Sequence, residues 1–335
     1  SLEATGHGFK IIKEKEGVTV DYDKTVEQLY TYVTEKWNKK ANIKLTATTT
    51  VSKPKYTTED CEKVSNEPMG SYTTEFSVGS SYTNRNLNIQ NGAKLINGAV
   101  VYPGEQYSCN ENLYPWTEDN GWHPAGTYVD GGVQDSLGGG ICQVSSTLYN
   151  ALLRAEIKVV KRFPHSMAVG YVPLSADAAL AGDYKDLVFE NDTDAPIYVQ
   201  GIYNSGGSIT FNIYGHDTRK AGHSVKYESK TVKTTPVKTQ TKKDSSKPVG
   251  YSEVESSGHV GYVAELWKIT YENGKQVSKE LIHTSTYAMS PTIVVKGTKK
   301  ASTTTKKDDS DKNDKKSSEE TTKKSTSSKK SKKSE

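Results

Sequence analysis

The sequence is poor in cysteine and contains no long apolar run. Its three cysteines, Cys61, Cys109 and Cys142, are too few and odd in number for a disulfide framework, so we expect all three to be reduced. If Cys61 and Cys109 did pair, Cys142 would still be the leftover thiol. Because no stretch of about 20 apolar residues occurs, no transmembrane helix is predicted. The sequence opens abruptly at SLEATGHGFK without a signal peptide, and we expect any membrane anchor to lie in a preceding N-terminal segment.

Motifs for cofactors are absent as well. The sequence contains no HExxH or CxxC pattern for a metal, no GxGxxG turn and no Walker motif, so we predict no metal and no other cofactor. Basic charge is concentrated at the end of the chain, where residues 299–335 hold 13 lysines and 7 acidic residues. The whole chain carries +4, so residues 1–298 carry about −2 and are not typical of a nucleic-acid-binding protein.

Phenylalanine is scarce, with 5 residues, whereas tyrosine is frequent, with 21. Abundant tyrosine, threonine and valine favour β-rich domains that face solvent. Residues 299–335 have no aromatic side chain and no aliphatic one beyond Ala301, so they cannot build a core and are predicted to be a disordered tail. The lysines of this tail could contact anionic wall polymer or membrane, but a merely solvated tail is the simpler interpretation.

The stretch that organises the rest of the chain spans residues 131–155. Three glycines at 138–140 precede Ile141 and Cys142, and apolar residues then recur at helical spacing, which predicts an amphipathic helix. Cys142 is therefore expected at a helix N-terminus, where partial positive charge favours the thiolate. Backbone amides of Gly139, Gly140 and Ile141 could form an oxyanion hole. A buried cysteine that only packs is an equally good interpretation of the spacing alone.

Changes in pattern along the chain predict an α+β protein with four parts. Residues 1–68 form a small α+β domain with a helix at 24–39, and residues 69–220 form a mixed central domain in which the cysteine-bearing helix packs on β-strands. Residues 221–298 alternate like strands without a clear helix, which predicts an extended all-β module. The tail at 299–335 completes the chain.

Several motifs in the central part are characteristic of one family. They include GGGICQVSSTLYNA at 138–151, Tyr102-Pro103-Gly104-Glu105, Pro164-His165-Ser166 and Tyr171-Val172-Pro173. On these motifs, residues 70–215 resemble the VanW domain of bacterial cell-envelope proteins. Residues 9–66 look like the end of a peptidoglycan-binding domain, and residues 221–298, with Gly258-x-x-Gly261, resemble a G5 domain.

The resemblance implies an L,D-transpeptidase that forms 3–3 cross-links between peptidoglycan stem peptides. Its nucleophile is the cysteine of the glycine–cysteine motif, which is Cys142 here. The implied partners are stem peptides and glycan, with carbapenems as covalent inhibitors, and the implied location is the cell wall or the outer face of the membrane. Two alternatives stay open: a non-catalytic wall-binding protein, and a cysteine peptidase or carboxypeptidase that acts on stem peptides.

A cysteine nucleophile needs a base and a group that orients the base. His165 follows a proline at the end of a predicted strand and lies in a family motif, so we favour it as the base over a structural role. The orienting group could be Ser166, Asp177 or Asp186, and the resemblance favours Asp177.

Four residues are candidates for contact with the substrate: Arg85, Ser166, Tyr171 and Trp122. Arg85 could hold a stem-peptide carboxylate, because a guanidinium binds a carboxylate through two hydrogen bonds. It could equally cap local structure. Trp122, like Trp116, could line a groove for sugar or peptide, or could merely pack.

Overall fold

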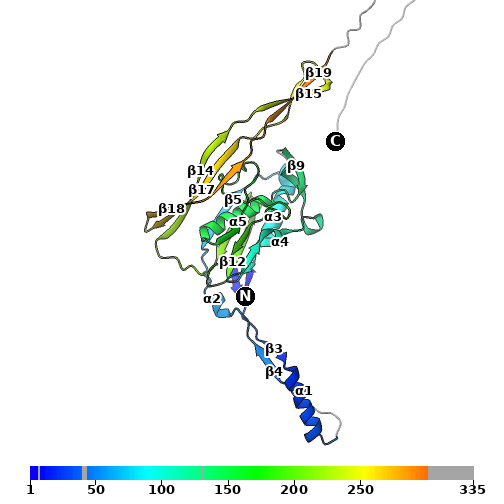
Figure 1. The fold of residues 1–335 in the computed structure, drawn as a ribbon, viewed down its shortest axis with the longest axis vertical. Helices are drawn as coiled ribbons and strands as arrows, with labels where there is room; N and C mark the ends of the chain where they lie inside the picture. The colour runs from blue at the N-terminus through cyan, green and yellow to red at the C-terminus, as the bar shows by residue number, and fades with distance from the viewer. Residues whose placement is uncertain (7, 40–43, 130–131, 301–335) are drawn as a thin grey trace, which may run out of the picture.

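The computed structural model describes residues 1–6, 8–39, 44–129 and 132–300. Its mixture of helices and small sheets confirms the predicted α+β class. Figure 1 shows an elongated molecule in which a narrow N-terminal arm and a long β module extend from opposite sides of a central domain. The predicted tail lies outside the described residues from residue 301 onward. No described helix combines the length and apolar character needed to cross a membrane.

The N-terminal arm is built from a helix and a strand pair. Helix α1 (Tyr22–Thr31) continues as a π-helical turn to Lys36, and it begins where the Asp21 side chain accepts a hydrogen bond from the Lys24 amide at 3.1 Å. The helical segment therefore runs from Tyr22 to Lys36, so it both begins and ends earlier than the predicted range of 24–39. Strands β3 (Gly17–Val20) and β4 (Thr49–Ser52) pair in an antiparallel manner beside it.

The two ends of the first 68 residues pack on the central domain rather than on α1. The hairpin of β1 (Leu2–Thr5) and β2 (Gly8–Ile11) and the short helix α2 (Thr58–Glu62) share a small apolar cluster with the central sheet. This cluster consists of Leu2, Cys61, Val64, Tyr198 and Tyr214. Cys61 is thus a buried packing residue, and all three cysteines are free, as predicted.

The central domain is a four-stranded antiparallel sheet covered by two helices. The sheet order is β5-β13-β12-β6, and helices α3 and α5 pack against it and against each other. Helix α5 is buried on all sides, because every residue except Cys142 and Arg154 is buried. The elements are β5 (Gly70–Glu75), α3 (Thr83–Ile96), β6 (Ala99–Val101), α5 (Ile141–Ala155), β12 (Ile197–Asn204) and β13 (Ser208–Tyr214).

Smaller elements surround this layer. A three-stranded sheet has the order β10-β11-β7, and a separate hairpin joins β8 to β9. Cys109 begins a short helix, because the Ser108 side chain caps the helix by accepting from the Glu111 amide at 3.1 Å. The bounds are β7 (Gln106–Ser108), α4 (Cys109–Leu113), β8 (Pro124–Val129), β9 (Gly132–Leu137), β10 (Lys158–Lys161) and β11 (Val188–Glu190), with 3₁₀ turns at Ser80–Tyr82 and Glu118–Asn120.

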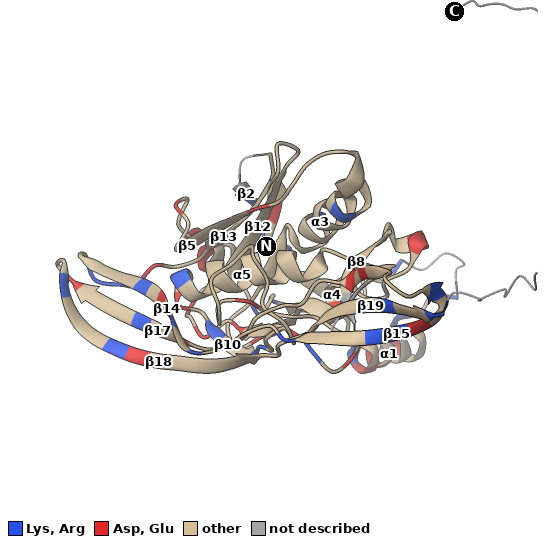
Figure 2. Cartoon of the chain, turned by 90° about the horizontal axis from the view of Figure 1, so that it is seen from above, with Lys and Arg blue, Asp and Glu red and all other residues tan. Residues whose placement is uncertain are grey.

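The C-terminal module consists of two three-stranded sheets joined end to end. One has the order β14-β17-β18 and lies along the central domain, and the other has the order β15-β19-β16. Lysines and a smaller number of acidic residues lie along the strands of the first sheet (Figure 2). The strands are β14 (His223–Thr235), β15 (Thr239–Pro248), β16 (Ser252–Ser256), β17 (Gly261–Glu272), β18 (Lys275–Tyr287) and β19 (Thr292–Lys299).

Candidate active site

Cys142 is the second residue of helix α5. The N-cap of the helix is Gly140, whose φ of 109° lies in the left-handed region that favours glycine. Gly139 packs so closely on β8 that a Cβ there would lie 2.3 Å from the Ala125 carbonyl oxygen. The glycine turn therefore fixes the start of α5, and with it the place of the thiol.

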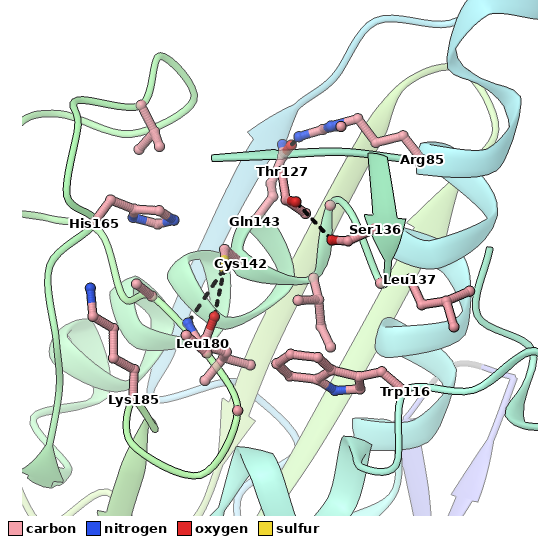
Figure 3. Close-up of a pocket in the computed structure, with 18 of the residues that line it drawn as sticks. Arg85, Trp116, Thr127, Ser136, Leu137, Cys142, Gln143, His165, Leu180 and Lys185 are labelled. Atoms are coloured by element: carbon pink, nitrogen blue, oxygen red, sulfur yellow. Dashed lines mark hydrogen bonds between the residues drawn. The ribbon is translucent and has the colours of Figure 1, made fainter. Parts of the chain in front are cut away.

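The N-terminus of α5 opens into a pocket of about 980 Å³. Figure 3 shows Cys142 between two walls, with His165 and Lys185 on one side and Arg85 on the other. The ring of Trp116 lies at the edge of the same pocket. The described residues that line it include these cationic groups and no Asp or Glu. Such a lining favours an anionic or neutral ligand over a cationic one.

The thiol has a backbone donor and a histidine beside it. The Leu180 amide donates to Cys142 Sγ at 3.4 Å, and the Leu180 carbonyl oxygen lies equally far from Sγ (Figure 3). Burial alone would raise the pKa of Cys142, but the hydrogen bond and charge of His165 and the Leu180 amide outweigh burial and lower that pKa.

Asp177 holds the histidine from behind. Its Oδ2 accepts from His165 Nδ1 at 2.6 Å and from the His165 backbone amide at 2.7 Å. Burial would lower the pKa of His165, but the hydrogen bonds to Asp177 and Cys142 outweigh burial and raise the pKa to about 9. Both shifts favour the pair of thiolate and imidazolium, which is the reactive form of a cysteine nucleophile.

The carboxylate is buried and fully paired. Asp177 is 1% exposed, and its Oδ1 accepts from Arg162 Nη2 at 2.8 Å and from the Tyr287 hydroxyl at 2.5 Å. Although burial opposes ionisation, these donors and His165 hold the pKa of Asp177 well below its ordinary value. Asp177 is thus a permanent anion throughout the neutral range.

The other two candidates for the orienting group lie elsewhere. Asp186 accepts from the Ser108 hydroxyl at 2.6 Å and from the Asn110 amide at 3.0 Å, so it supports the start of α4. Ser166 lines the pocket next to His165. Of the three candidates, the structure places Asp177 alone against the imidazole.

The predicted oxyanion amides are only partly free. The Gly139 amide donates to the Ser136 carbonyl at 3.3 Å, and the Ile141 amide donates to the Gly138 carbonyl at 3.0 Å. The amide of Cys142, in the first turn of α5, has no acceptor within the part of the chain that the structure describes. The Gly140 amide likewise has no backbone acceptor among the described residues, so these two amides and the positive end of the helix dipole are available to stabilise a developing negative charge.

Arg85 is fixed at the pocket by a neighbour of the cysteine. Its Nη2 donates to Gln143 Oε1 at 2.7 Å. Gln143 is itself buried and donates through Nε2 to Thr74 Oγ1 at 3.0 Å and to the Glu75 carbonyl at 2.8 Å. The guanidinium thus lines the pocket in a set position, where it can bind a carboxylate.

Two of the remaining predicted contacts line the pocket, and one does not. Ser166 and Tyr171 do, and the Tyr171 hydroxyl lies 3.4 Å from His165 Nε2. Trp122 was expected at the substrate, but it is fully buried in the hydrophobic core and does not line the pocket. Its place at the rim is taken by Trp116.

Some pocket residues were not predicted from the sequence. Gln143 lies in the glycine–cysteine motif, but the sequence assigned it no role. The Leu180 amide is a backbone group, so no side chain in the sequence indicates that it donates to Cys142. Lys185 also lines the pocket, with its Nζ held by the Pro164 carbonyl at 3.0 Å. Among the described residues, no group of three or more His, Cys, Asp or Glu side chains could hold a metal ion.

Comparison with known proteins identifies two domains. Residues 84–214 match the family described as VanW like protein, and residues 226–299 match the G5 domain. The chain thus contains a VanW-like region followed by a G5 region. The family resemblance of these two regions is confirmed. The peptidoglycan-binding domain expected upstream stays a prediction.

Two curated relatives are similar to the central part of the chain. The uncharacterized protein YoaR of Bacillus subtilis is 37% identical over 49% of this chain and 53% of its own length. The vancomycin B-type resistance protein VanW of Enterococcus faecalis is 28% identical over 33% of this chain and 42% of its own length. The chain therefore spans about half the length of these relatives. The solved G5 domain of an IgA1 protease is 30% identical over 24% of the chain, with a TM-score of 0.19.

Proposed function

We propose that the protein is an L,D-transpeptidase of the cell wall, located outside the cytoplasmic membrane. The observation that carries this proposal is Cys142 and His165 at one pocket, with Asp177 buried behind the imidazole, a lowered thiol pKa and a protonated imidazole. The G5 domain, a kind of module we expect to bind wall glycan, supports the same location.

The first step transfers an acyl group to the cysteine. The Cys142 thiolate attacks the carbonyl carbon between the third residue of a tetrapeptide stem and its terminal D-Ala. The negative charge on the former carbonyl oxygen faces the Cys142 amide and the end of α5. The C–N bond then breaks, His165 gives its proton to the departing amine of D-Ala, and a thioester remains on Sγ.

The second step forms the cross-link. The side-chain amine of the third residue of another stem attacks the thioester carbon, and neutral His165 takes a proton from that amine. The C–S bond breaks, and the thiolate and imidazolium pair returns. The product joins the third residues of two stems, so the whole cycle consumes one tetrapeptide donor and releases one D-Ala.

The cations of the pocket suit such a donor. The tetrapeptide ends in the carboxylate of D-Ala, and Arg85 is held where its guanidinium can pair with that group. Ser166, Tyr171 and Trp116 supply polar and aromatic surface for the rest of the stem. A carbapenem also carries a carboxylate beside a reactive carbonyl, and we expect it to acylate Cys142 irreversibly.

The test is intact-protein mass spectrometry after incubation with purified disaccharide-tetrapeptide. The proposal expects a covalent adduct and a dimeric muropeptide that lacks one D-Ala. Cys142→Ala should abolish both, and Cys61→Ala, which removes a cysteine far from the pocket, should retain both.

Other products would point elsewhere. Release of D-Ala without a dimer would indicate a carboxypeptidase, and cleavage inside the stem would indicate an endopeptidase. Unchanged tetrapeptide with a thiol inert to iodoacetamide would favour the non-catalytic wall-binding protein and overturn the proposal.

A further inference from the structure

One strand of the G5 domain contributes side chains to the rear of the candidate active site. Strand β18 carries His283, Ser285 and Tyr287 at alternate positions, so their side chains share one face of the strand. That face is turned toward the loop that runs from Ser175 to Leu180. The loop matters because it carries Asp177, which holds His165, and the Leu180 amide, which donates to Cys142.

Tyr287 contacts the loop at two points. Its hydroxyl donates to Asp177 Oδ1 at 2.5 Å and accepts from the Ser175 amide at 2.6 Å. The side chain is 3% exposed, so water does not compete for either bond. The next residue, Ala288, donates its amide to the Ser166 carbonyl at 2.7 Å. The end of β18 thus binds the chain at two places, at Asp177 and at Ser166, which is next to His165.

The two other residues of the strand complete a buried network. Ser285 Oγ accepts from Arg162 Nη1 at 2.9 Å and from Ser175 Oγ at 2.8 Å. His283 Nε2 lies 2.8 Å from the Tyr149 hydroxyl, and its Nδ1 lies 3.1 Å from Ser175 Oγ. Burial and the charge of Arg162 lower the pKa of His283 to about 4, so this histidine is neutral at physiological pH.

We propose that the G5 domain completes the catalytic centre, with Tyr287 as a positioning residue that holds Asp177 and, through it, His165. This inference rests on the proposed function, because it needs Cys142 and His165 to be the reacting pair. It assigns the G5 domain a second task besides binding to the wall. The catalytic unit is then the VanW-like domain together with the first G5 sheet.

The argument is physical. Asp177 Oδ1 has two donors, Arg162 from the central domain and Tyr287 from the G5 domain. Loss of the tyrosine hydroxyl leaves one donor for Oδ1 and leaves the buried Ser175 amide without an acceptor, which loosens the loop. A loose loop holds both the carboxylate and the Leu180 amide less well, so the thiolate loses part of its stabilisation.

The inference is tested by the pH dependence of alkylation at Cys142, which every titratable or charged neighbour can affect. The neighbours of Asp177 are Arg162, which follows β10, together with His165 and Tyr287 of β18. Tyr149 of α5 acts on it at longer range. Cys142 faces His165 and Tyr171. Asp177 stays ionised and Arg162 stays charged, so a shifted midpoint of alkylation reports on the pair of Cys142 and His165.

The experiment compares Tyr287→Phe with Tyr227→Phe in the full chain. Tyr227 lies in the same G5 sheet, and its hydroxyl donates to the Leu153 carbonyl at 2.8 Å, so the control loses one hydroxyl at the same domain interface. Alkylation of Cys142 by iodoacetamide is measured against pH by peptide mapping. Tyr287→Phe should raise the midpoint by about one pH unit and lower the rate by about tenfold at pH values below the wild-type midpoint. Tyr227→Phe should change neither.

Thermal unfolding of both variants shows whether the fold is kept. If Tyr287→Phe does not fold, Ser285→Ala, which also loses only a hydroxyl of the network, takes its place with a smaller shift in the same direction. A reactive wild-type thiol with an unchanged midpoint in the folded variant overturns this inference and leaves the proposed function standing. A wild-type thiol that is inert at neutral pH overturns both.

Discussion

Replacement of Asp177 by asparagine would test the charge pairing at the centre of the site. The carboxylate accepts two hydrogen bonds from His165, one from Arg162 and one from Tyr287. An amide of the same shape has one acceptor oxygen and one donor nitrogen. Whichever way it turns, its NH₂ group therefore faces donors that it cannot pair with.

The size of the effect follows from the imidazole. A pKa raised from 6.5 to about 9 corresponds, at about 1.4 kcal/mol per unit, to about 3 kcal/mol in favour of the charged ring. Asp177 and Cys142 share this stabilisation. Loss of the Asp177 part lowers the imidazolium population and raises the thiol pKa, so alkylation at pH 7 should fall on the order of 100-fold. Arg162 is left as a buried charge without its partner, which costs about 3–5 kcal/mol of stability.

The assay is the rate of iodoacetamide alkylation at Cys142, measured together with the free energy of unfolding in urea. The matched control is Asp186→Asn, because Asp186 is also partly buried and hydrogen-bonded but supports α4. We expect the control to keep the wild-type alkylation rate. Alkylation of Asp177→Asn at the wild-type rate, or an equal loss in both variants, would refute the reasoning.

Three further outcomes follow from the same geometry. Cross-linking should fall as the pH rises through about 9, because His165 then loses the proton that the leaving amine needs, whereas alkylation of the thiolate over the same range should not fall. Arg85→Gln should raise the KM for tetrapeptide by about 10- to 100-fold through the loss of a charged hydrogen bond, with alkylation by neutral iodoacetamide unchanged. Gly139→Ala should destabilise the protein by about 1–3 kcal/mol in urea titration, since its Cβ would meet the Ala125 backbone.

The start of helix α5 could be predicted from the sequence because its signals are local. Three glycines, a cysteine and an apolar repeat within 18 residues are enough to place Cys142 near a helix N-terminus, and the helix does begin at Ile141. The sequence could also suggest His165 and Asp177, but only through motifs of a family. The hydrogen bond between them spans 12 residues of irregular chain, which no periodicity describes.

Burial was harder to predict than secondary structure. The repeat in α5 predicts one apolar face, yet the opposite face is covered by the loop around Asp177. The polar residues of that face are paired instead of solvated: Ser145 Oγ donates to the Ala178 carbonyl at 2.7 Å, and Asn150 Nδ2 donates to the Ala176 carbonyl at 2.7 Å. The prediction that Trp122 contacts substrate was wrong for the same reason, because a tryptophan in a polar stretch gives no local sign that its side chain is buried in a core. Strand β15 has only a weak local signal, because its residues, rich in threonine and lysine, are mostly exposed.

The contact between Tyr287 and Asp177 explains why separate domain boundaries give an incomplete account of the site. These residues are 110 positions apart and lie in regions that match two different families. The VanW-like region alone contains Asp177 without Tyr287, and the G5 region alone contains Tyr287 without Asp177. Only the fold shows that the buried carboxylate has three donors from the central domain, one on Arg162 and two on His165, and a fourth from Tyr287 of the G5 domain. Substitution of Tyr287 therefore tests the site as directly as substitution of the cysteine, since Tyr287 holds Asp177, which holds the histidine beside Cys142.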